Sequence, residues 1–151
     1  AGPLRQPWLQ FRCDAITRLV REVHGAVRQA APECRISAAV FSNYPGCRDG
    51  VGQDWALWVR SGWLDFVCPM DYTASDVQFR NLAAMQMGVV GGRIPCYPGI
   101  GLLEGLGPVG AVRQIQITRD LGTGGFIVWS VFPEYITAVY PYLGLGILKG
   151  R

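Results

Sequence analysis

The segment Leu64-Asp-Phe-Val-Cys-Pro-Met-Asp-Tyr-Thr73 decides the fold expected for this chain. Its apolar run ends abruptly at Pro69, and a short polar and aromatic group follows. An uninterrupted apolar run is typical of a parallel strand that is buried on both faces and delivers polar groups at its carboxyl end. In barrel enzymes the residues at the carboxyl ends of strands carry the chemistry. Asp71 and Tyr72 are therefore the first candidates for a functional site.

The composition favours a single α/β domain over residues 1–151, with a loop over 1–12 and a tail over 143–151. Half of the 151 residues are hydrophobic and 17% are charged, as expected for strands buried beneath helices. The net charge of +3 is small and the basic residues are scattered, so no nucleic-acid partner is expected. No apolar stretch reaches the length of about 18 residues that a membrane span needs.

The titratable side chains argue against several kinds of site. The five cysteines are odd in number and show no CxxC spacing, which favours reduced, structural thiols over disulfides, and neither a metal nor a cofactor is expected. The lone histidine, His24, stands among charged residues of a helix and is expected at the surface, which disfavours Cys-His and Ser-His-Asp mechanisms. The chain has no recognisable signal peptide and reads as a piece of a longer protein, so its localisation stays open.

Apolar spacing and turn residues predict one helix followed by four strand-helix units. The first helix has Asp14 as a candidate cap and ends before Pro32, and Ser75 with Gln78 forms a capping box. Strand-helix alternation at this spacing indicates right-handed units and a parallel sheet. The expected strands are 35–41, 64–70, 93–97 and 126–132; the expected helices after the first are 55–60, 75–87, 108–121 and 133–142, with loops over 43–52 and 98–107.

Six motifs in this order and spacing resemble the C-terminal half of the glycoside hydrolase-like 10 family of bacterial TIM-barrel proteins. The similarity extends from about Trp8 to Phe132. The motifs are Trp8-x-x-Phe11-Arg12, Ile36-Ser-Ala-Ala-Val-Phe41, Gln53-Asp54-Trp55 with Trp58, Gly62-x-Leu64-Asp65-Phe66-Val67-x-Pro69-Met70-x-Tyr72, Tyr97-x-Gly99-Ile100-Gly101 and Gly122-x-x-Gly125-Phe126.

The resemblance implies half of a (β/α)8 barrel, comprising units five to eight, and a parent protein of the bacterial cell envelope or a secreted one. A whole barrel takes about 250 residues. In barrel glycosidases of this type a catalytic carboxylate commonly ends strand four, and this chain begins after that strand. Four strands with helices on one side leave one sheet face bare, so we expect the half-barrel to be completed by self-association as a homodimer or larger homo-oligomer.

Asp71 is the candidate catalytic carboxylate, because glycoside hydrolysis needs two carboxyl groups that flank the scissile bond. Its strand-end position would place it in the barrel mouth, where Tyr72 could hydrogen-bond a sugar or a neighbouring acid. Two other roles for Asp71 stay open. It could cap the helix near Ser75, or it could bind a sugar hydroxyl without catalysing.

Further substrate contacts are expected at the other strand ends, each with a structural alternative. Trp55, Tyr97 and Trp129 could stack on sugar rings or pack in the core. Asp54 could contact substrate or cap its helix, and Asn43 could line the mouth. Glu104 could reach the mouth or be a solvated loop residue, and the glycines around it lack a dinucleotide or P-loop pattern.

Two functions follow from these candidates. The first is carbohydrate binding or hydrolysis of a glycan at the carboxyl ends of the strands. The second is a half-barrel that homo-oligomerises without glycosidase activity.

Overall fold

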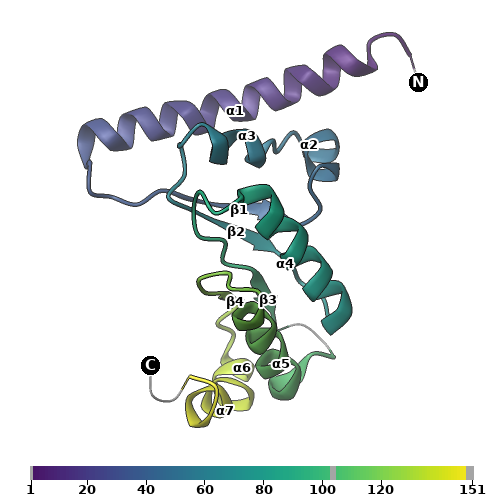
Figure 1. The fold of residues 1–151 in the computed structure, drawn as a ribbon, viewed down its shortest axis with the longest axis vertical. Helices are drawn as coiled ribbons and strands as arrows, with labels where there is room; N and C mark the ends of the chain where they lie inside the picture. Colours follow the sequence, from purple (N-terminus) through teal and green to yellow (C-terminus); the bar gives the residue numbers. More distant parts are fainter. Residues whose placement is uncertain (1, 103–104, 149–151) are drawn as a thin grey trace.

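The structure is a computed structural model that describes residues 2–102 and 105–148, and it shows a mixed α/β chain with short parallel strands in two small sheets (Figure 1). The expected α/β class and parallel strands are thus confirmed, whereas no closed barrel is formed within the described residues. The elements in chain order are α1 (Arg5–Ala30), β1 (Ser37–Phe41), α2 (Gly46–Val51), α3 (Trp55–Arg60), β2 (Phe66–Met70), α4 (Asp76–Val90), β3 (Gly99–Gly101), α5 (Gly107–Asp120), β4 (Ile127–Trp129), α6 (Pro133–Ala138) and α7 (Tyr140–Leu145).

The strands form two pairs, and the segment before β3 links the pairs through backbone hydrogen bonds. Strand β1 pairs with β2, and β3 pairs with β4. Between the two sheets, the N–H of Val67 in β2 donates to the carbonyl of Pro95 at 3.1 Å, and the N–H of Tyr97 donates to the carbonyl of Val67 at 2.8 Å. The segment 95–101 therefore bonds to β2 through its first residues and to β4 through its last ones.

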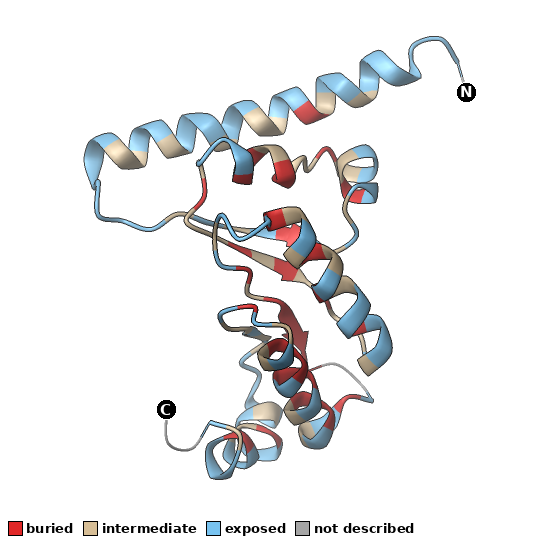
Figure 2. Ribbon diagram, viewed as in Figure 1, coloured by how far each residue is buried: buried red, intermediate tan, exposed pale blue. Residues whose placement is uncertain are grey.

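The helices cover one side of these strands and leave the other side open (Figure 2). Helix α1 packs against α2 and α3, α3 against α4, α4 against α5, and α5 against α7. In β1 the side chain of Val40 is fully buried, whereas that of Phe41 is 47% exposed. The alternation follows from the pleat of a strand, in which successive side chains point to opposite faces.

The core consists of two apolar clusters under the helices. The first surrounds Trp55 and Trp58 of α3 and includes Val40, Val67 and Val90 from the two strands and α4. The second joins α4, β3, α5 and α7 and includes Phe79, Ile100, Leu102, Ile115 and Leu143.

Three predicted helices form for the predicted local reasons. The carboxylate of Asp54 accepts from the N–H of Leu57 at 3.2 Å and so caps α3, and the hydroxyl of Ser75 accepts from the N–H of Gln78 at 3.3 Å and caps α4. Helix α5 has a proline in its first turn, where a missing N–H costs nothing.

The prediction of a loop over residues 1–12 was wrong. Helix α1 begins at Arg5, so Asp14 lies inside the helix and does not cap it. Pro7 falls within the first turn, where no intrahelical hydrogen bond is lost. The rings of Trp8 and Phe11 then stack on the helix surface with centroids 5.6 Å apart, a contact that helical spacing allows.

Several further boundaries differ from the predictions, and the strand expected over 126–132 is confined to β4, Ile127–Trp129. The loop expected over 43–52 contains α2, and the expected last helix is interrupted at Val139 between α6 and α7. The tail expected from residue 143 begins inside α7, where Leu143 is buried. The strand expected over 93–97 contributes a single bridge at Cys96, and β3 instead forms at Gly99–Gly101, inside the predicted glycine-rich loop.

Asp65 joins α1 to the amino ends of β1 and β2. Its carboxylate accepts from the guanidinium of Arg28 at 2.8 Å and from the N–H of Ile36 at 2.6 Å. The hydrogen bond from Ile36 and the charge of Arg28 lower the pKa of Asp65. Its contribution to stability is therefore present above the pKa of an unfolded aspartate and is lost as the pH falls through the lower folded value.

We expect Asp65→Ala to reduce the free energy of unfolding by about 1–3 kcal/mol at pH 7, since it leaves the N–H of Ile36 and a cation without their acceptor. The difference from the parent chain should shrink below pH 4. Urea unfolding followed by circular dichroism measures it. Asp49→Ala is the control, because that exposed carboxylate is bonded to Arg48 alone. Equal losses in the two variants would contradict this role.

Candidate functional site

Two aromatic residues from the carboxyl ends of β2 and β4 meet in space. Tyr72 follows β2 and Trp129 ends β4, and their rings stack with centroids 6.0 Å apart and an interplanar angle of 22°. Trp129 is 52% exposed, so part of its ring faces solvent. We call this pair the aromatic platform.

The glycines of β3 make room for the aromatic platform. A Cβ at Gly101 would lie 3.0 Å from the Cβ of Tyr72, and one at Gly99 would lie 2.8 Å from the carbonyl oxygen of Pro69. Tyr72 therefore crosses β3 over Gly99 and Gly101, which carry no side chains, and so reaches Trp129. The N–H of Leu102 donates to the carbonyl of Trp129 at 2.7 Å and holds the ends of β3 and β4 together.

Asp71 points away from the aromatic platform, in contrast to its expected place in a mouth. Val67, Pro69 and Asp71 occupy every second position along β2 and just after it, and their side chains point toward the helices. Asp71 is only 1% exposed. Its Oδ1 accepts from Nε2 of Gln86 in α4 at 2.6 Å, and its Oδ2 has no hydrogen-bond partner. Ser75, and not Asp71, caps the following helix.

Burial raises the pKa of Asp71 to about 7, with the hydrogen bond from Gln86 acting in the opposite direction. Desolvation penalises the charged carboxylate more than the neutral acid. The carboxyl group is therefore largely protonated in mildly acidic solution. The neutral acid also avoids the cost of a buried charge that has no ionic partner.

Two buried glutamines support the ends of the strands, and neither was predicted. Nε2 of Gln86 also donates to the carbonyl of Ser42 after β1, at 3.0 Å, and Nε2 of Gln114 in α5 donates to the carbonyl of Thr73 at 2.8 Å. Both side chains are fully buried. A polar residue at an apolar helix position was the available signal: Gln86 follows Phe79 and Ala83 on the buried face of α4.

The candidates near β1 are mainly structural. Trp55 is fully buried, so it cannot stack on a sugar in this fold. The side chain of Asp54 caps α3 and also accepts from the hydroxyl of Tyr44 at 3.1 Å and from Nε of Arg48 at 3.2 Å. Asn43 is exposed just beyond β1, and its carbonyl accepts the N–H of Cys47 at the start of α2.

Tyr97 and Glu104 do not join the aromatic platform. The ring of Tyr97 packs against Phe66, the first residue of β2, with centroids 5.2 Å apart, and therefore lies near the opposite end of that strand. Glu104 lies outside the described residues. His24, expected at the surface, is half-buried, with Nδ1 3.2 Å from the carbonyl oxygen of Trp63.

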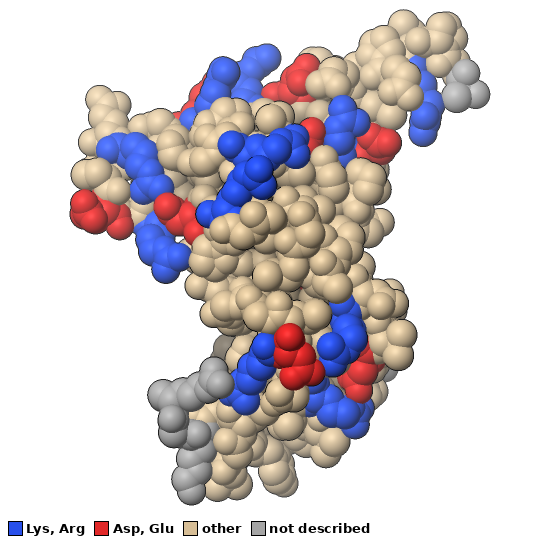
Figure 3. All heavy atoms as spheres, in the orientation of Figure 1, with Lys and Arg blue, Asp and Glu red and all other residues tan. Residues whose placement is uncertain are grey.

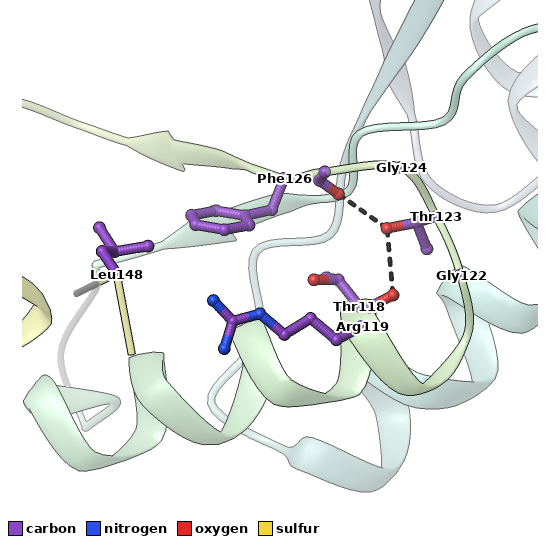
Figure 4. A pocket seen from close by; sticks show the side chains of 8 residues that line it. Thr118, Arg119, Gly122, Thr123, Gly124, Phe126 and Leu148 are labelled. Atoms are coloured by element: carbon purple, nitrogen blue, oxygen red, sulfur yellow. Dashed lines mark hydrogen bonds between the residues drawn. The ribbon is translucent and has the colours of Figure 1, made fainter. Parts of the chain in front are cut away.

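A pocket of about 400 Å³ lies beside the loop that leads into β4, at the other end of that strand from Trp129 (Figure 4). The hydroxyl of Thr123 in its wall donates to the carbonyl of Gly125 at 2.7 Å. The guanidinium of Arg119 donates to the carbonyl of Ile147. These polar groups hold the turn before β4 and the segment that follows α7, so their hydrogen bonds are structural.

On the surface seen in Figure 3, basic and acidic side chains lie together in the upper part of the view and again in the lower part. An uncharged band separates these two parts. Several are paired, as in Arg28 with Asp65 and Arg80 with Asp120. Within residues 2–102 and 105–148 no cluster of three or more His, Cys, Asp or Glu side chains could hold a metal ion. In the same residues no helix has the length and apolar character needed to cross a membrane.

Comparisons of the chain with protein-family models, curated proteins and solved structures gave no match. The resemblance to glycoside hydrolase-like 10 proteins therefore rests on the six sequence motifs alone.

The raised pKa of Asp71 makes a prediction about stability. Its folded value of about 7 lies above that of an unfolded aspartate, so the stability from the neutral acid is complete below pH 4 and is lost as the pH rises to 7. The loss should be on the order of 4 kcal/mol, at 1.36 kcal/mol per pH unit. Asp71→Asn should lack this dependence, because an amide does not ionise.

The measurement is the free energy of unfolding in urea between pH 4 and pH 9 for the parent chain and for Asp71→Asn. Asp14→Asn, at an exposed position in α1, is the matched control and should follow the parent. Parallel pH profiles for the parent and Asp71→Asn would show that Asp71 does not remain neutral in the folded chain.

Proposed function

We propose that this chain binds a carbohydrate at the carboxyl ends of its strands, with the aromatic platform as the surface on which a sugar ring stacks. The observation that carries the proposal is the exposure of Trp129, which is 52% accessible although its ring is already stacked on Tyr72. An aromatic ring held in place from behind loses little freedom when a ligand covers its other face. Sugar rings present flat C–H faces that suit such a surface.

The contacts of Asp71 support a positioning role within this proposal. Its hydrogen bond from Gln86 draws the residue toward α4, and Tyr72, the next residue, then lies across β3. Hydrolysis is the narrower form of the proposal. It would need Asp71 to turn toward the substrate and a second carboxyl group to face it across the glycosidic bond. The family resemblance implies that such a partner belongs to another part of the barrel.

A half-barrel without glycosidase activity that associates with itself is the second candidate function. The observation that favours it is the open, apolar side of the strands, where Phe41 and Ile127 are 47% and 39% exposed. Binding of a sugar and self-association do not exclude each other, because the first uses the strand ends and the second uses the length of the strands.

Substitution of Trp129 tests the sugar proposal. Isothermal titration calorimetry with soluble oligosaccharides of glucose, xylose and N-acetylglucosamine should identify a ligand of the parent chain. Trp129→Ala should weaken its binding about tenfold, which corresponds to about 1.4 kcal/mol of stacking energy. Trp8→Ala is the matched control, because Trp8 is a similarly exposed tryptophan, at 58%, on α1.

Binding of none of these oligosaccharides, or an equal loss in both variants, would contradict the proposal. Hydrolysis is checked by product analysis with the same ligands and with Asp71→Asn. Products from the parent chain and none from Asp71→Asn would favour the catalytic form over the binding form.

A further inference from the structure

The side of the strands that faces away from the helices is open at β1 and β4, whereas Tyr72 lies over the glycines of β3, and we call this side the open face. Strands β1, β2, β3 and β4 contain no charged residue. The side chains of Phe41, Ile127 and Trp129 are between 39% and 52% exposed on this side. Antiparallel sheets with a solvated face normally carry polar residues there, whereas parallel sheets are covered on both sides. The open face is therefore apolar and uncharged along its strands, as a surface covered by another layer of protein would be.

The two outer strands have no further strand beside them within the described residues, although the N–H of Phe41 at the end of β1 already donates to Oε1 of Gln53 at 2.8 Å. Within the described residues β1 pairs with β2 alone, and β4 pairs with β3 alone. Neither β1 nor β4 contains the lysine, proline or inward charge that usually blocks further pairing at an edge. All pairings are parallel, so the edge of β4 in one chain and the edge of β1 in another can join with the same strand direction.

We propose that the open face is covered by a second copy of this chain. A two-fold axis parallel to the strands would pair β4 of each copy with β1 of the other. Both junctions are then identical, no edge is left, and the assembly closes as an eight-stranded barrel with the two open faces inside. This proposal rests on the second candidate function, self-association, and adds the partner surface and the symmetry; it does not depend on sugar binding.

The exposed apolar side chains of the open face would form the centre of the interface. Phe41 and Ile127 are 47% and 39% exposed, and Ala39 of β1 is exposed on the same face as Phe41. At roughly 150–250 Å² for a whole large side chain, Phe41 and Ile127 contribute about 160 Å² per copy. The other strand residues and the two strand junctions must supply the rest of the roughly 1,000 Å² at which specific interfaces begin.

A second exposed apolar surface offers a competing mode of association. Leu4, Trp8 and Phe11 lie together on the first turns of α1, at the end that projects beyond the rest of the molecule (Figure 1). Pairing through this surface would leave the open face and both strand edges uncovered. For that reason we assign the second copy to the open face, and the test separates the two surfaces.

Closure of a barrel would complete the candidate site. Each copy carries one aromatic platform at the carboxyl ends of its strands, and a two-fold axis along the strands places both platforms at the same end. The mouth would then present two Trp129 rings, one from each copy, and a glycan would be held between identical halves.

Light scattering on the purified chain gives the first result. We expect a mass of twice the 16.5 kDa of one chain at micromolar concentration. Ile127→Glu places a charge on the open face and should shift the chain to a monomer, with dissociation at least 100-fold more favourable. Val77→Glu is the control: this β-branched residue is 71% exposed on α4, in the helical layer, and its variant should remain dimeric.

Hydrogen exchange on the unmodified chain gives a result that needs no variant, in case Ile127→Glu does not fold. Amides of residues 37–41 and 127–129 should become more protected as the chain concentration rises, whereas those of α4 should not change. A monomer at all concentrations would overturn the proposal. So would a dimer that Trp8→Glu dissociates and Ile127→Glu leaves intact. Sugar binding is measured separately by calorimetry. A dimer that binds no glycan would contradict the sugar proposal alone, and a monomer that binds a glycan would contradict the dimer proposal alone.

Discussion

The contact between Gln86 and Asp71 is the constraint on which the strand ends depend. One amide nitrogen in α4 donates to the carboxyl group after β2 at 2.6 Å and to the carbonyl of Ser42 after β1 at 3.0 Å. The residues that directly follow two neighbouring strands are thereby held against the same helix. The bond between Gln86 and Asp71 is buried, where a hydrogen bond that is left unmade costs more than it does at a surface.

The direction of Asp71 sets the direction of the residue after it. Because Asp71 turns toward the helices, Tyr72 turns to the other side and lies over the two glycines of β3. The tyrosine ring then supports Trp129, whose outer part remains exposed. Asp71 and Tyr72 are consecutive in sequence, but they serve different layers of the molecule: Asp71 is a buried support for the strand end, and Tyr72 is part of the aromatic platform.

Local chemistry made the helices with clear end signals predictable. Asp54, Ser75 and the proline at the start of α5 act within one turn of their own position, so no knowledge of the fold is needed to interpret them. The predictions failed where a distant residue decides the outcome. The glycines of β3 indicate a loop when taken alone, and they form a strand because Tyr72, far away in sequence, occupies the space that side chains would fill. The sequence around Asp71 predicted its position at a strand end, but it did not predict the hydrogen bond from Gln86 of α4.

The amino-acid sequence by itself determined the succession of parallel strands and helices, the places where α3, α4 and α5 begin, and the candidates at the strand ends. These properties follow from side-chain periodicity and capping, which act over a few residues. The tertiary structure alone decided which candidates meet. It placed Tyr72 against Trp129, buried Trp55, and turned Asp71 toward Gln86, because each of these outcomes depends on space left or filled by residues remote in the chain.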